Sequence, residues 1–105
     1  MTALAVVIKA RARRVHLTDD ELIVELDDGR TIHVPLAWFP RLQYGTPEER
    51  ARWQLIGDGE GIHWPDLDED IEVEHLLLGI PSQESRESFR RWLETRRRGR
   101  NKGES

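Results

Sequence analysis

The chain has 105 residues, of which 37% are hydrophobic and 34% are charged, and it contains no cysteine. This length suits one domain, since two domains would each have too few residues for a core. The absence of cysteine excludes disulfide bonds and thiolate zinc sites. No apolar stretch is long enough for a signal peptide or a membrane span, so we expect a soluble cytoplasmic protein that does not contact membranes.

Charge is divided unevenly along the chain, although the net charge is only −4. Residues 1–81 contain 8 Lys or Arg and 16 Asp or Glu, whereas residues 82–105 contain 8 and 4. The first part is therefore acidic and the second part is basic. Because an acidic surface repels phosphate, a nucleic-acid surface would have to lie in the C-terminal part.

Three strands are predicted in the first third of the chain, because apolar and polar residues alternate there. They span residues 13–17, 22–26 and 31–35. The second and third strands are separated by Asp-Asp-Gly at 27–29, which is a strong turn signal.

The length of this turn follows from the faces of the two strands. A three-residue loop places Val24 opposite Ile32 and Leu22 opposite Val34, so that all four side chains share one face. A two-residue loop would put the third strand's apolar residues on the other face. We therefore predict the three-residue loop, with Gly29 in a left-handed conformation.

Two short helical segments are predicted next. The apolar stretch 36–42 lies between prolines and should form a helical turn over one face of the sheet. A second helix should begin at Pro47, because Thr46 suits the N-cap and acidic residues follow it. We expect this helix to end near Trp53.

A hairpin is predicted from residues 54–56 and 62–64 across the loop 57–61. This loop is glycine-rich but lacks the Lys-Ser/Thr of a phosphate-binding loop, so we read it as a turn. The predicted buried side of the sheet comprises Leu22, Val24, Leu26, Ile32, Val34, Leu55 and Ile62.

The last part of the chain is predicted to be helical. The acidic run 66–70 should be a solvated turn, and residues 73–78 should form a short helix with Gly79 just past its end. A final amphipathic helix should start after Ser82 or Ser85 and end at about Arg97. Its apolar stripe comprises Phe89, Trp92 and Leu93.

The expected architecture is thus α+β, with a small curled antiparallel sheet, short helices and a C-terminal amphipathic helix. Residues 1–98 should form one domain, and residues 99–105 a basic, disordered tail.

Several segments resemble a bacterial family known as domain of unknown function 2442. The resemblance spans about residues 13–93 and is carried, in order, by DGR, VPLAWFPRL, GIHWP, LDEDI, LLLG and PSQES. It implies a small α+β domain with a curled antiparallel sheet, and it implies no activity. Some similar proteins carry a helix-turn-helix domain after this one, which we do not expect here. Others are encoded beside a second small protein, in an arrangement that looks like a toxin–antitoxin pair.

Two acidic or histidine motifs could carry chemistry. Asp66, Asp68 and Asp70 alternate as calcium ligands do, but an EF-hand would need Gly and Glu at later positions that are occupied by other residues. His63 precedes this run, and a carboxylate near an imidazole can prepare a general base. An enzyme using His63 with Asp68 or Asp70 is therefore one alternative.

We favour a simpler interpretation in which His63 forms a hydrogen bond with the acidic loop and pins it to the sheet. No Ser or Cys nucleophile is evident nearby, and no cofactor loop or metal-ligand spacing is present. We therefore predict that the chain is not an enzyme and uses no cofactor or metal.

The best candidate for a partner surface is the aromatic turn around Trp38, where Arg41 offers a planar donor group. Arg41 could equally pair within the chain with the acidic run. The candidate surface comprises Trp38, Arg41, His63, Trp64, Asp68, Glu69 and Asp70. We predict a protein-interaction or regulatory module, such as the antitoxin-like member of a two-protein system, with a small protein as its partner.

The alternative partner is nucleic acid, bound by the arginine-rich C-terminal helix. The residues that would contact phosphate are Arg90, Arg91, Arg96, Arg97, Arg98 and Arg100. The acidic body competes with phosphate for these side chains, and no aromatic residue among the last arginines is available to stack on bases. A protein partner is therefore favoured.

Overall fold

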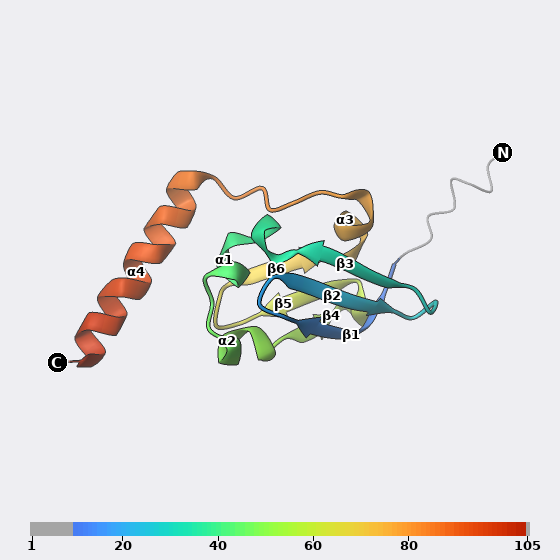
Figure 1. Ribbon diagram of the computed structural model, residues 1–105, viewed down its shortest axis with the longest axis horizontal. Helices are drawn as coiled ribbons and strands as arrows, with labels where there is room; N and C mark the ends of the chain where they lie inside the picture. Colours follow the sequence, from blue (N-terminus) through green and yellow to red (C-terminus); the bar gives the residue numbers. More distant parts are fainter. Residues whose placement is uncertain (1–9, 105) are drawn as a thin grey trace.

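The computed structural model describes residues 10–104, and the side chains of residues 10–99. Within this range the fold is α+β, with two three-stranded antiparallel sheets, short helices and one long C-terminal helix (Figure 1). The predicted α+β class is confirmed, although the strands are divided between two sheets. None of the described helices combines the length and apolar character needed to cross a membrane.

The first sheet contains β1 (Ala12–Leu17), β2 (Glu21–Leu26) and β3 (Thr31–Pro35), in that spatial order. Val24 lies opposite Ile32 and Leu22 lies opposite Val34, as the three-residue loop requires. Gly29 has a φ of 98°, a conformation that glycine adopts without strain. The predicted loop and register are therefore confirmed.

Three helical turns connect the two sheets. They are η2 (Leu36–Trp38), α1 (Pro40–Gln43) and α2 (Pro47–Ala51). The predicted N-cap of α2 is present: the Thr46 hydroxyl accepts from the Glu49 N–H, and the Glu49 carboxylate accepts from the Thr46 N–H. The helix ends at Ala51, slightly before the predicted position.

The second sheet contains β4 (Gln54–Ile56), β5 (Gly61–Trp64) and β6 (Glu69–Glu72). The β4-β5 hairpin is confirmed, and the 3-10 turn η3 (Gly57–Gly59) forms its loop. A Cβ atom on Gly59 would lie only 2.5 Å from the backbone oxygen of Ala12, so this loop contacts β1 directly.

Strand β6 was not predicted, because its sequence is acidic and suggested a solvated turn. Its side chains nevertheless alternate, with Ile71 buried and both of its neighbours exposed. Ile71 lies opposite Ile62 on β5, and this apolar pair holds the acidic segment in the sheet.

The two sheets share one apolar core, which includes Leu22, Val24, Ile62, Trp64 and Ile71. The predicted burial of Leu55 is wrong: its side chain is 36% exposed. Leu55 lies opposite the buried Ile62, but β4 is a three-residue edge strand at the margin of the core, and all its residues are exposed.

Helix α3 (Val73–Leu78) ends at Gly79, which has a φ of 74° as expected for a residue just past a helix. Residues 80–85, which we call the strap, cross the molecule from α3 to α4 (Arg86–Glu104) (Figure 1). The Ser85 hydroxyl accepts from the Ser88 N–H and begins α4. The helix extends to Glu104, past the predicted end.

Candidate functional site

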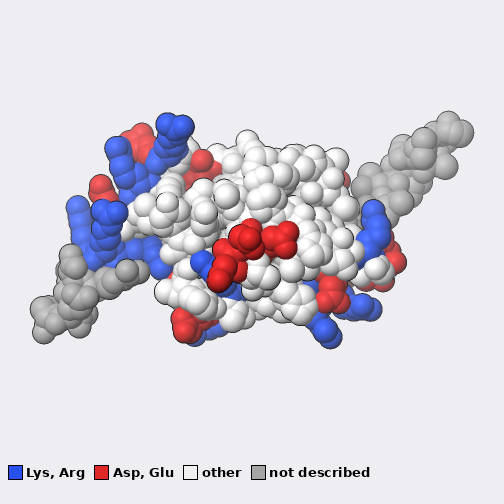
Figure 2. Space-filling view, viewed as in Figure 1, with Lys and Arg blue, Asp and Glu red and all other residues white. Residues whose placement is uncertain are grey.

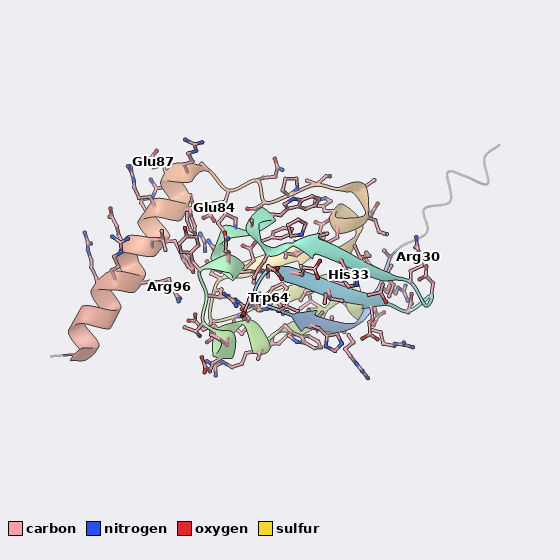
Figure 3. All side chains as sticks on the ribbon, viewed as in Figure 1. Arg30, His33, Trp64, Glu84, Glu87 and Arg96 are labelled. Atoms are coloured by element: carbon pink, nitrogen blue, oxygen red, sulfur yellow. The ribbon has the colours of Figure 1, made fainter. Side chains whose placement is uncertain are left out.

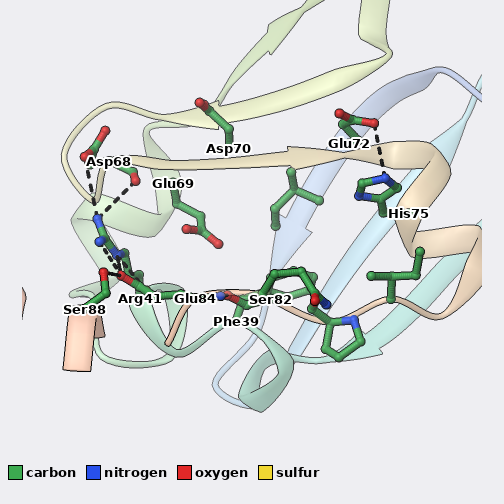
Figure 4. Close-up of a pocket in the computed structure, with 14 residues that line it drawn as sticks. Phe39, Arg41, Asp68, Glu69, Asp70, Glu72, His75, Ser82, Glu84 and Ser88 are labelled. Atoms are coloured by element: carbon green, nitrogen blue, oxygen red, sulfur yellow. Dashed lines mark hydrogen bonds and ion pairs between the residues drawn. The ribbon is translucent and has the colours of Figure 1, made fainter. Parts of the chain in front are cut away.

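A cleft of about 460 Å³ lies between β6 and the strap (Figure 4). Strand β6 supplies one wall, and the strap with the first turn of α4 supplies the other. Helix α1 and the residue before it contribute an arginine and an aromatic side chain. The residues that matter most for its chemistry are Phe39, Arg41, Glu69, Ile71, Glu84 and Ser88.

Glu69 is the central acidic group of this cleft. It lies opposite Trp64 in the sheet, so its side chain is on the inner face of β6 and points into the cleft (Figure 4). Burial raises the pKa of Glu69 to about 7, and the nearby guanidinium of Arg41 only partly offsets this effect. Among the described residues, no side chain or backbone group donates a hydrogen bond to the Glu69 carboxylate.

Arg41 and Glu84 form a closed ion pair in the wall of the cleft, and each side chain is only 14% exposed. The Arg41 guanidinium contacts both carboxylate oxygens of Glu84, with Nε 2.9 Å from Oε1. The Ser88 hydroxyl donates to the same carboxylate at 2.7 Å. These hydrogen bonds, first that from Arg41, lower the pKa of Glu84. Both charges are therefore satisfied within the protein.

The sequence left open whether Arg41 is exposed to a partner or pairs within the chain, and the structure shows that it pairs within the chain. Its main partner is Glu84, and the acidic run contributes mostly backbone: Nη1 donates to the carbonyl oxygen of Asp68 at 3.2 Å. The Asp68 carboxylate is 3.7 Å away and largely exposed. Arg41 is thus an internal anchor rather than an exposed donor.

His63 lies outside the lining of the cleft, on the outer face of β5. Its Nδ1 atom forms a hydrogen bond with the carboxylate of Asp70, the residue opposite it on β6. The predicted link between His63 and the acidic segment is confirmed.

Trp64 is corrected from a surface candidate to a core residue, since its side chain is 0% exposed. It lies on the same face of β5 as Ile62, which points inward, and its Nε1 donates to the Arg50 carbonyl oxygen at 3.0 Å. Trp38 is half-buried against the core, and its carbonyl oxygen accepts from the Ser82 N–H of the strap. Trp64 therefore presents no aromatic face to a partner, and Trp38 is only partly exposed.

The structure therefore brings Arg41, Asp68, Glu69 and Asp70 to one cleft, whereas His63, Trp38 and Trp64 are not part of its lining, although His63 bonds Asp70. Glu84 and Ser88 were missed by sequence reasoning. The only pattern that could have pointed to them is an acidic residue just before the last helix with a serine four positions later, and this pattern is too common to predict a site.

The arginines of α4 have different environments. Arg96 pairs with Glu49 of α2, and Arg91 pairs with Glu87 on the helix surface. Arg90, Arg97 and Arg98 are exposed and form no ion pair with any described side chain. The side chain of Arg100 lies outside the described residues. Figure 2 shows Lys and Arg gathered over α4.

Among residues 10–99, no three His, Asp or Glu side chains are arranged to hold a metal ion.

Residues 12–82 match the family described as protein of unknown function DUF2442, and the chain belongs to this family. A search of curated proteins finds no match.

Two solved structures are similar to this chain. One is a crystal structure of a protein of unknown function from Rhodospirillum rubrum, with 26% sequence identity and a TM-score of 0.63, covering 71% of this chain and 93% of that one. The other is a solution NMR structure of an uncharacterized protein from Chromobacterium violaceum, with 20% identity and a TM-score of 0.60. It covers 70% of this chain and 69% of that one, and this second likeness concerns the fold alone.

Proposed function

We propose that the chain is a non-catalytic protein-interaction module that holds its partner at the cleft between β6 and the strap. The observation that carries this proposal is the Glu69 carboxylate, which is enclosed in the cleft without a hydrogen-bond donor among the described residues. A largely buried carboxylate without a donor is unfavourable, and a partner that supplies one gains binding free energy.

The charge of the cleft indicates the chemistry of the partner. Asp68, Asp70 and Glu72 line it together with Glu69, and the positive charge of Arg41 is already neutralised by Glu84. A basic side chain is therefore the group that the cleft favours.

Two features support a non-catalytic role. The Ser88 hydroxyl donates to the Glu84 carboxylate, which is a weak base because its ion pair with Arg41 lowers its pKa. The His63 imidazole is not part of the cleft lining and bonds the Asp70 carboxylate, whereas His75, which does line the cleft, lies 3.4 Å from the Glu72 carboxylate. A catalytic site would need these groups to converge on one point.

Similar proteins are often encoded beside a second small protein, and this arrangement favours one version of the proposed function, the neutralising member of a two-protein system. The partner would then be the small protein encoded beside this chain.

The experiment is a pull-down from the native host with the full chain and a cleft variant, Asp68→Asn with Glu69→Gln. The matched control, Asp19→Asn with Glu74→Gln, removes the same charge elsewhere on the surface. We expect one stoichiometric protein with the wild type and the control, and its loss from the cleft variant. Retention by the cleft variant, or no stoichiometric protein at all, would contradict the proposal.

A second candidate function is nucleic-acid binding by α4. The observation that favours it is that three of the predicted arginines, Arg90, Arg97 and Arg98, are exposed and form no ion pair with a described side chain, as is also true of Arg86, whereas Arg96 is engaged by Glu49. If the helix neutralised about four phosphates of duplex DNA, log affinity would fall with log salt at a slope of about −3.6. A triple change of the three arginines to alanine would abolish this binding, whereas Arg91→Ala would reduce it little.

A further inference from the structure

We propose that the outer edge of β6 receives an extended, basic segment of the partner as an added β-strand. This inference rests on the proposed function and specifies how the partner binds. It follows from the register of β6, from the space beside it and from the charges around it.

The register shows which backbone groups of β6 face outward. The N–H of Val73 donates to the carbonyl oxygen of Glu60 at 2.9 Å, and this pair continues the β5-β6 register, in which Gly61 lies opposite Glu72. Opposite pairs in an antiparallel ladder alternate between bonded and non-bonded. The backbone groups of Asp70 and Glu72 therefore point away from β5.

Three of these four outward groups have no partner in the described part of the chain. Glu72 is the N-cap of α3, so its carbonyl oxygen accepts the first hydrogen bond of that helix. No hydrogen bond to the Glu72 N–H, or to the N–H or carbonyl oxygen of Asp70, is found there, and β6 is an edge of its sheet. Two N–H groups and one carbonyl group are thus available to a strand laid alongside β6. Adding a strand to such an edge is a common way to bind an extended peptide.

The space beside β6 is open because the strap does not pair with it. The strap is held elsewhere: the Ser82 N–H donates to the Trp38 carbonyl oxygen, and Glu84 is fixed by Arg41. The cleft of about 460 Å³ lies between the strap and β6, with Glu69 and Ile71 lining it (Figure 4).

Charge selects the sequence of the added strand. Successive side chains of a strand point to opposite faces, so those of the partner would reach Glu69 on one face and Asp70 and Glu72 on the other. Lys or Arg residues at alternate positions all lie on one face of the added strand, and whichever face that is, they would meet either Glu69 or the pair Asp70 and Glu72. A cation beside Glu69 would also favour its ionised form, which burial otherwise opposes.

Short, charged edge strands also occur where a protein prevents unwanted strand pairing. The test therefore uses two acetylated and amidated heptapeptides, Thr-Lys-Val-Lys-Val-Lys-Thr and the same sequence with Glu in place of Lys. Each is titrated into the full-length ¹⁵N-labelled chain, and amide shifts and hydrogen exchange are recorded by NMR. We expect the lysine peptide to bind, with shifted and newly protected amides at Asp70 and Glu72, and the glutamate peptide not to bind.

Two variants at one position separate backbone pairing from charge. Glu72 has a φ of −85°, which proline tolerates, so Glu72→Pro removes the outward N–H together with the carboxylate. Glu72→Ala removes the carboxylate alone. We expect Glu72→Pro to bind the lysine peptide about five- to tenfold more weakly than Glu72→Ala, as the loss of one hydrogen bond predicts. Glu69→Gln should weaken binding about tenfold by removing a charged acceptor.

Several outcomes would overturn this inference: no binding of either peptide, equal binding of both peptides, equal affinity of the two Glu72 variants, or amide shifts confined to the β4 edge at Leu55 and Ile56. The proposed function is tested separately by the pull-down. A host protein that depends on Glu69 but binds Glu72→Pro and Glu72→Ala equally would leave the proposed function standing and exclude strand addition.

Discussion

Arg96 and Glu49 lie 47 residues apart in the sequence and form a two-pronged ion pair, with nitrogen–oxygen distances of 2.7 and 3.0 Å. Glu49 also accepts from the Thr46 N–H, so one carboxylate caps α2 and holds α4 against the body. The Arg96 guanidinium lies 4.7 Å from the ring centre of Trp92. In Figure 3 the Arg96 side chain extends from α4 toward the rest of the molecule.

The first prediction concerns this ion pair, whose side chains are 17% and 18% exposed. A double-mutant cycle of Arg96→Ala and Glu49→Ala should give a coupling free energy of about 1–2 kcal/mol, because the pair is bidentate and sheltered. The exposed pair Arg91 and Glu87 should give about 0.3–0.5 kcal/mol in the same urea-unfolding measurements. Equal coupling in the two cycles would show that α4 is not held by Arg96.

The second prediction is that Glu69 makes stability fall as pH rises. Burial raises the pKa of Glu69 from an ordinary value of 4.5 to about 7. Between these values the unfolded chain releases the proton while the folded chain keeps it, so the free energy of unfolding decreases as pH rises and levels off above pH 7. Glu69→Gln should therefore stabilise the protein at pH 8 by about 1–3 kcal/mol and change little at pH 4.

The measurement is urea unfolding across this pH range. Glu74→Gln, at an exposed position on α3, is the matched control and should not produce this pH-dependent gain. If Glu69→Gln and Glu74→Gln changed stability alike at every pH, Glu69 would not be the buried acid that the cleft requires.

The third prediction compares two glycines with positive φ. Gly29 has open space around it, so Gly29→Ala should destabilise the fold only through backbone strain, by about 1 kcal/mol. At Gly59 the added Cβ would also lie 2.5 Å from the backbone oxygen of Ala12. Gly59→Ala should therefore cost about 3 kcal/mol or more, because β1 or the hairpin loop must move. Thermal unfolding that ranks the variants in the reverse order would exclude this contact.

The fourth prediction concerns Trp64, which is fully buried and donates to the Arg50 carbonyl oxygen. Trp64→Phe should destabilise the protein by about 1–3 kcal/mol, since it leaves a small cavity and an unpaired acceptor. Trp53→Phe, at a half-buried position, should cost less than about 1 kcal/mol. Both can be measured by chemical denaturation, and similar losses at the two positions would contradict the core placement of Trp64.

Local signals in the sequence were enough to predict most of the fold. The alternation in β2 and β3, together with Asp-Asp-Gly between them, determined the pairing of Val24 with Ile32. Thr46 and Pro47 predicted the start of α2, because an N-cap residue forms its hydrogen bonds within the first turn of the helix. Strand β6 was not predicted, because Ile71 is the only apolar residue on its buried face and the acidic residues around it are typical of a solvated turn.

The candidate site was only partly predictable, because it depends on contacts between distant segments. The sequence identified Arg41 and the acidic run, but Arg41 is paired with Glu84, 43 residues away. Burial of Trp64 could have been predicted, because Trp64 stands two residues after Ile62 and strand alternation places both on the buried face. Glu69 stands between two exposed acids, and only the pairing of β6 with β5 distinguishes it from them.

The way in which α4 is attached has a mechanical consequence. From the C-terminal side, its contacts with the body follow the chain: Arg96 on Glu49, then Trp92, then Ser88 and Glu84 beside Arg41. A pulling force on the end of α4 would break these contacts one after another, starting from Arg96. In an optical trap held at both ends of the chain, we therefore expect a short extension from release of the helix and strap before the sheets rupture.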